Sequence, residues 1–89
     1  MRIAVLDGDA ISTREELHDA LARELALPAW YGRNLDALYD CLTDCDPPRH
    51  LTLRNRAALG ETPFGRRLLR VLTDAARNDP MHLKLNLED

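Results

Sequence analysis

Apolar residues follow two different periods along this 89-residue chain. Residues 2 to 6 are a short, almost continuous apolar run that ends at Asp7-Gly8-Asp9, which predicts a buried strand followed by a tight turn. Residues 50 to 54 and 81 to 87 instead alternate between apolar and polar side chains, the period of a strand with one buried face. We therefore expect three strands, and the inward-facing leucines of the last two are Leu51, Leu53, Leu83, Leu85 and Leu87.

The segment after the first strand has the spacing of an amphipathic helix. It begins at Ser12 or Thr13, each of which has a glutamate three residues later as in a capping box, and it stops before Pro28. Its polar side is expected to include His18. Its apolar stripe consists of Leu17, Ala20, Leu21 and Leu25.

A second amphipathic helix is predicted from residue 66 to residue 77. It follows an irregular segment, residues 55 to 65, which has room for a short helical turn at 56 to 59, and Asn78-Asp79-Pro80 ends it. Its core face consists of Leu68, Leu69, Leu72, Ala75 and Ala76.

The remaining helix is expected to run from Asn34 to Thr43 or Asp44. Gly32 should provide a backbone turn that few other residues allow, and Asn34 is a favourable N-cap. At about 100° per residue, one side of this helix carries only apolar residues, namely Leu35, Leu38, Cys41 and Leu42. The other side carries Asp36, Tyr39, Asp40, Thr43 and Asp44, and no Lys or Arg occurs between Asn34 and Asp46. A solvated helix face normally mixes both signs of charge, so this face predicts a surface for a cationic partner.

Local helix preferences do not explain these aspartates. The helix dipole favours a carboxylate at Asp36 in the first turn, but Asp40 is in mid-helix and Asp44 is near the C-terminus, where the dipole disfavours it. A binding face explains both placements.

Three aromatic residues belong to the same region. Tyr39 lies on the acidic face and is best explained as an interface anchor, whereas Trp30 suits an anchor and a packing residue equally well. Tyr31 is expected to pack inward and to hold the loop.

The order strand, helix, helix, strand, helix, strand predicts an α/β fold with a small three-stranded parallel sheet covered by helices. A chain of this length forms one domain, residues 1 to 89, with no room for a second core.

The net charge of −3 hides an asymmetry between the two parts of the chain. Residues 1 to 48 carry four Lys or Arg against ten Asp or Glu, and residues 49 to 89 carry eight against five. The seven arginines from Arg49 to Arg77 leave open a small nucleic-acid-binding domain, although such a protein would be expected to have a basic excess overall.

The chemistry of an enzyme is not indicated. Asp36 and Asp40 are close enough to couple, but an exposed helix face supplies no desolvated cleft, nucleophile or charge stabiliser. The three histidines fall on three different elements, and no phosphate loop or metal-ligand spacing is present. We therefore expect no catalytic residue, no metal and no cofactor.

The cysteines and the hydropathy of the chain indicate the cellular compartment of the protein. Cys41 and Cys45 lie four residues apart, a poor spacing for a structural disulfide, and are expected to be thiols in a reducing cytoplasm. Asp7 interrupts the first apolar run before it resembles a signal peptide, and no run approaches the roughly 20 residues of a membrane span.

The sequence from Leu25 to Pro28, followed by Tyr31-Gly32-x-Asn34-Leu35-Asp36-Ala37-Leu38-x-Asp40-Cys41-Leu42-Thr43, closely resembles the barstar family, intracellular inhibitors of the secreted ribonuclease barnase. The resemblance extends more loosely over the whole chain, including the order of strands and helices. It implies a protein that is monomeric when free and that binds a basic extracellular or toxin ribonuclease one-to-one, without contacting nucleic acid directly.

In that family the helix and the loop before it plug the nuclease active site, and the carboxylate that matches Asp40 occupies the place of a substrate phosphate. Other family interface positions match Trp30, Gly32, Asn34, Asp36, Tyr39, Thr43 and Asp74. With Asp44 from the acidic face, these are the expected partner-binding residues.

Several positions depart from the family pattern. Trp30 and Tyr39 exchange the family's aromatic types, Asp44 and Cys45 replace a glycine and a tryptophan, and Asn78 replaces an acidic residue. The binding mode is therefore expected to be kept while the cognate nuclease differs. The alternative is a regulatory module of the same fold that binds another basic protein without any effect on RNA cleavage.

Overall fold

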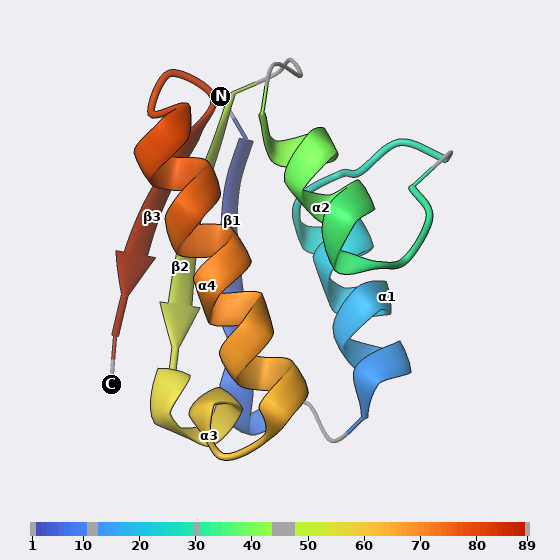
Figure 1. The fold of residues 1–89 in the computed structure, drawn as a ribbon, viewed down its shortest axis with the longest axis vertical. Coiled ribbons are helices and arrows are strands. Elements are labelled where there is room, and N and C mark those ends of the chain that lie inside the picture. The colour runs from blue at the N-terminus through green and yellow to red at the C-terminus, as the bar shows by residue number, and fades with distance from the viewer. Residues whose placement is uncertain (1, 11–12, 30, 44–47, 89) are drawn as a thin grey trace.

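The computed structural model of this chain describes residues 2–10, 13–29, 31–43 and 48–88. Three strands form one parallel sheet in the order β1-β2-β3, and the helices pack against one of its faces (Figure 1). In chain order the elements are β1 (Arg2–Asp7), the 3-10 helix η1 (Gly8–Ala10), α1 (Arg14–Glu24), α2 (Leu35–Leu42), β2 (Arg49–Arg54), α3 (Arg56–Gly60), α4 (Pro63–Asn78) and β3 (Leu83–Leu87). The α/β fold and the parallel sheet predicted from the sequence are confirmed.

The sheet has one buried face and one exposed face. Across the strands, Ala4 pairs with Leu51, and Leu51 pairs with Leu85, so the inward residues form a continuous apolar layer. On the opposite face Ile3 and Val5 are 72% and 49% exposed. Parallel sheets are usually covered on both faces, whereas the helices of this protein cover only one. Most of the apolar area that this sheet buries therefore lies on its inner face.

The core consists mainly of leucines contributed by every predicted element. The stripe predicted for α1 is buried, together with Leu25 just beyond its end. From α4 the buried residues are Leu68, Leu72 and Ala75, while Leu69 and Ala76 pack more loosely against them. In β2 Leu51 and Leu53 are fully buried, and in β3 Leu83 is buried more deeply than Leu85 and Leu87.

Helix α4 begins three residues earlier than residue 66, so its predicted start was wrong. Thr62 is its N-cap and accepts a hydrogen bond from the Gly65 N–H at 3.0 Å, and Pro63 occupies the first turn, where a missing N–H costs little. Gly65 is required because a Cβ there would collide with the carbonyl of Leu59 in α3. Pro63 and Gly65, which belong to the segment expected to be irregular, instead serve the start of α4 and its packing on the expected helical turn, α3.

Arg49 is buried at the start of β2, so it is not available to the nucleic-acid-binding surface that the seven arginines from Arg49 to Arg77 left open. Its Nε donates to the carbonyl of Leu25 at 2.8 Å, and one terminal nitrogen donates to the carbonyl of Cys41 at 2.9 Å. Arg49 therefore ties the chain after α1 and the last turn of α2 to the central strand. Within the described part of the chain, no helix is long and apolar enough to cross a membrane.

Candidate partner-binding surface

Helix α2 is built so that its acidic face points away from the core. Asn34 caps it as predicted: the Oδ1 atom accepts a hydrogen bond from the Ala37 N–H at 2.8 Å. Leu38, Cys41 and Leu42 are fully buried and Leu35 is half-buried, so the opposite side is turned outward. Asp36 and Asp40 are exposed there, one helical turn apart. The apolar seam thus places both carboxylates on one outward face.

Thr43 ends this helix. Its N–H bonds to the Tyr39 carbonyl at 3.1 Å, and its hydroxyl donates to the same carbonyl at 2.9 Å. These contacts satisfy a carbonyl of the last turn and fix the position of the Thr43 side chain beside Tyr39. The oxygen of the Thr43 hydroxyl keeps its capacity to accept a hydrogen bond.

Helix α4 adds to the same surface, because α2 packs against it (Figure 1). The Asn78 side-chain nitrogen donates a hydrogen bond to the Tyr39 hydroxyl at 2.9 Å. Asp74 is exposed one turn before Asn78 on α4, so it faces the same way. Tyr39 therefore lies between the acidic face of α2 and the Asp74 side of α4.

The loop before α2 turns differently from the expectation for Gly32. The left-handed backbone conformation belongs to Arg33, with a φ of 57°, and none of the described glycines has a positive φ. The Arg33 side chain pairs with Asp19 at 2.7 Å and donates to the carbonyl of Glu15 at 3.3 Å, contacts that stabilise this unusual backbone. At Gly32 the constraint is the room for a side chain, because a Cβ there would lie 3.2 Å from the Asn34 side-chain nitrogen.

Tyr31 packs inward as expected, and it does so against a histidine whose placement was predicted wrongly. His18 is only 3% exposed, and its Nδ1 lies 2.6 Å from the Tyr31 hydroxyl. The His18 ring also packs edge-on against Phe64. Position 18 lies three residues before Leu21 and seven before Leu25, a spacing that could have revealed its inward orientation.

This buried pair is electrically neutral at physiological pH. Burial lowers the pKa of His18, and the nearby guanidinium groups of Arg33 and Arg14 lower it further. Burial raises the pKa of Tyr31 to about 12. The hydrogen bond between them therefore joins two uncharged groups and anchors the loop before α2 to α1.

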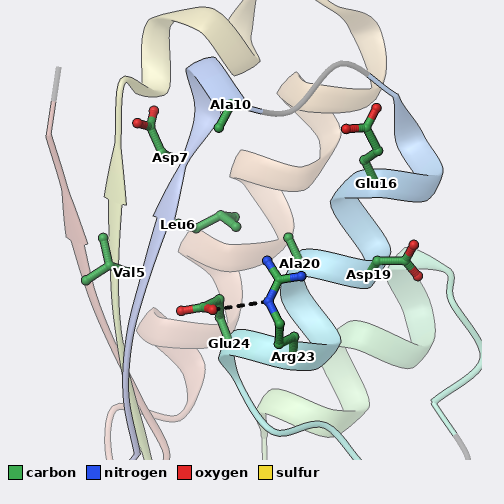
Figure 2. A pocket seen from close by; sticks show the side chains of 9 residues that line it. All are labelled: Val5, Leu6, Asp7, Ala10, Glu16, Asp19, Ala20, Arg23 and Glu24. Atoms are coloured by element: carbon green, nitrogen blue, oxygen red, sulfur yellow. Dashed lines mark hydrogen bonds and ion pairs between the residues drawn. The ribbon is translucent and has the colours of Figure 1, made fainter.

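A separate hollow of about 420 Å³ lies between β1 and α1 (Figure 2). Its carboxylates are Asp7, Glu16, Asp19 and Glu24, and Glu24 pairs with Arg23 at 3.4 Å. The side chain of Asn55 and the backbone N–H of Asp9 donate to the Asp7 carboxylate, which lowers its pKa. Among the described residues, no group of three or more His, Cys, Asp or Glu side chains has the arrangement of a metal site.

Comparison with known proteins identifies the family. Residues 1–88 match the family described as Barstar (barnase inhibitor). The chain belongs to the barstar family. A protein of Bacillus subtilis (strain 168) with the name "Putative ribonuclease inhibitor YrdF" is 50% identical over 56 residues. That match spans 62% of this chain and 62% of the relative, so the chain covers less than two thirds of the relative's length.

In this member of the barstar family, the structure brings most of the predicted binding residues to one side. Asp36, Tyr39, Asp40 and Thr43 lie along α2, Asp74 joins them from α4, and Gly32 and Asn34 shape the entrance to α2. Trp30 and Asp44 lie outside the described residues, as does Cys45.

Three residues with roles in this surface were not among the predicted binding residues. Arg49 and His18 act from beneath it, and Asn78 acts through Tyr39. Asn78 was noted in the sequence only through the resemblance, and its contact with Tyr39 arises from the packing of α2 on α4.

Proposed function

We propose that this protein inhibits a ribonuclease by binding it one-to-one and covering its active site with α2 and the loop before it. The observation that carries the proposal is the outward pair Asp36 and Asp40 on a capped helix in which no basic residue occurs. A ribonuclease active site is cationic because it binds phosphates, and a row of carboxylates can imitate the charge of the substrate backbone. Membership in the barstar family supports the same role.

In this proposal Asp40 takes the place of a substrate phosphate and meets the cationic side chains of the nuclease. Asp36 and Asp74 extend the negative surface on either side, and Tyr39 supplies an aromatic anchor between them. Gly32, Asn34 and Thr43 contribute contacts near the two ends of α2, and we include Trp30 and Asp44 in the contact set.

Preorganisation supports tight binding. The Asn34 cap, the Arg49 bond to the Cys41 carbonyl and the Tyr39–Asn78 bond hold α2 before any partner arrives. Little conformational entropy then remains to be lost on association, which favours affinity. We further propose that the free protein is a cytoplasmic monomer and that its partner is a basic extracellular or toxin ribonuclease, in keeping with the acidic first half of the chain.

The proposal is tested by titrating the protein into a fluorogenic RNA-cleavage assay with a panel of basic, barnase-like ribonucleases. We expect stoichiometric inhibition of at least one member. Asp40→Ala should abolish it, whereas Asp9→Ala, which removes an exposed carboxylate from η1, should retain it. A complex with a basic protein that leaves RNA cleavage unchanged would instead favour a regulatory module of the same fold.

A further inference from the structure

A hollow of about 280 Å³ beside the start of α2 gathers arginines from three distant parts of the chain. Arg14 comes from the first turn of α1, Arg33 from the loop before α2, and Arg67 from α4. The other lining residues are His18, Asn34, Leu35, Asp36 and Phe64. The fold thus brings together guanidinium groups from positions as far apart in the sequence as Arg14 and Arg67, more than half of the chain.

These arginines are not all neutralised by neighbours. The Arg14 guanidinium lies 4.6 Å from the centre of the Phe64 ring, a stacking contact that leaves its charge uncompensated. Arg33 pairs with Asp19. Arg67 forms no hydrogen bond or ion pair with the residues that the structure describes. Each side chain therefore has N–H groups available for a ligand.

Two uncharged features of the hollow also suit an anion. His18 is 3% exposed, and its Nε2 atom is buried without a hydrogen-bond partner. The first N–H groups of α2, at Leu35 and Asp36, have no acceptor within the helix, because the Asn34 side chain serves Ala37 instead. A buried polar group without a partner costs free energy, which a bound acceptor would recover.

We propose that this hollow binds a phosphate group, as inorganic phosphate or as part of a small phosphomonoester. Guanidinium groups bind phosphate oxygens through paired N–H donors, and the positive end of a helix dipole favours the same ligand. When the Tyr31 hydroxyl donates to Nδ1 of His18, Nε2 carries the ring proton, and a shift of the buried ring toward the hollow would bring this donor to a phosphate oxygen.

Charge balance favours such a ligand only modestly. The Asp36 carboxylate also lines the hollow, and Asp19 pairs with Arg33, so three guanidinium groups stand against two carboxylates. The excess positive charge and the N-terminus of α2 attract a phosphate, while Asp36 limits its affinity. This inference does not depend on the proposed inhibition of a ribonuclease.

The test is a titration of the full ¹⁵N-labelled chain with inorganic phosphate at constant ionic strength, followed by NMR. We expect saturable shifts of the Leu35 and Asp36 amides and of the His18 Nε2 resonance, and no saturable shift with chloride. A shift that never saturates, or saturable binding of acetate with equal affinity, would overturn the assignment of a phosphate site.

Two exposed arginines of α4 provide a matched pair of variants. Both arginines line a neighbouring hollow, but only Arg67 also lines this one, and Arg70 lies three residues further along α4. Arg67→Gln should weaken phosphate binding about ten-fold, because it removes charge-assisted hydrogen bonds, and Arg70→Gln should change it by less than about two-fold. Equal losses would show a general charge effect and contradict a defined site.

The source of the phosphate is distinguished by repeating the titration with ribose 5-phosphate. Binding at least about ten-fold tighter than that of inorganic phosphate would identify a phosphomonoester ligand, since a difference of that size requires contacts beyond the phosphate. Equal affinity would identify free phosphate as the ligand. Thermal unfolding of both variants checks that each remains folded.

Discussion

The side-chain amide of Asn78 donates a hydrogen bond to the hydroxyl of Tyr39 at 2.9 Å, across 39 positions of sequence. The resemblance to the barstar family singled out both positions as departures, and the structure places the two side chains in contact. The phenol of Tyr39 supplies the acceptor oxygen, and the neutral amide of Asn78 supplies the donor. This bond joins the helix that carries Asp36 and Asp40 to the helix that carries Asp74.

Removing the Tyr39 hydroxyl should have a small effect on stability. Tyr39→Phe should lower the free energy of unfolding by about 0.5–1.5 kcal/mol at most, because Asn78 is exposed and can bond to water instead. Urea unfolding of Tyr39→Phe, Asn78→Ala and the double variant measures the coupling. Strictly additive effects would show that the hydrogen bond contributes nothing.

Asp40→Ala should separate binding from folding. The side chain is exposed on α2, so its loss should change the free energy of unfolding by less than about 0.5 kcal/mol. Affinity for the partner ribonuclease should fall by at least about 2 kcal/mol, because cationic groups of the partner would be left buried without a counter-charge. Calorimetric titration and urea unfolding give both quantities. Unfolding of the variant would mean that Asp40 has a structural role.

Stability should fall with decreasing pH because of His18. Burial holds the pKa of the folded state below the ordinary value of 6.5, so the unfolded chain binds more protons once the pH drops below about 6.5. The free energy of unfolding should therefore decline from that pH down to the folded-state pKa and be insensitive to His18 above it. Urea unfolding between about pH 5 and 8 tests this.

The matched control for urea unfolding at different pH values is His18→Gln. Glutamine keeps an acceptor for the Tyr31 hydroxyl but does not titrate. Its stability should lose most of the dependence on pH in this range. If the slope of the variant equals that of the original protein, the decline arises from other groups.

Arg49→Lys should be strongly destabilising although the charge is conserved. A lysine ammonium lacks the planar fork with which Arg49 reaches the carbonyls of Leu25 and Cys41, so at least one buried carbonyl would lose its donor. A loss of about 1–3 kcal/mol is expected from urea unfolding. Arg54→Lys at the exposed end of the same strand is the control and should change stability by less than about 0.5 kcal/mol.

Two glycines near the start of α4 should respond in opposite ways to alanine. At Gly65 the added Cβ would collide with the Leu59 carbonyl, so Gly65→Ala should cost about 1–3 kcal/mol despite the better helix propensity of alanine. At Gly60 nothing lies within 4 Å and φ is not positive, so Gly60→Ala should be neutral or stabilise by about 0.4–1 kcal/mol. Thermal unfolding compares them, and a stable Gly65→Ala variant would show that α3 can move away.

The local pattern of apolar and polar residues was sufficient to predict the strands and main helices and to predict which side of α2 faces outward. Strands and helices differ in the period of their apolar residues, and a leucine seam together with the Asn34 cap determines which side of α2 faces outward. The acidic row, the inward Tyr31 and the leucine layers of the sheet could therefore be predicted from neighbours in sequence. Which of these residues contact a partner stays a prediction.

Contacts between distant segments could not be derived in this way. His18 is buried against the Tyr31 hydroxyl, Tyr39 is bonded by Asn78 of α4, and the left-handed Arg33 pairs with Asp19 of α1. The strand order β1-β2-β3 and the convergence of Arg14, Arg33 and Arg67 likewise arise only when the helices pack on the sheet. Periodicity reports which face of an element is apolar, but the free energy of a polar side chain depends on the partner that packing brings to it.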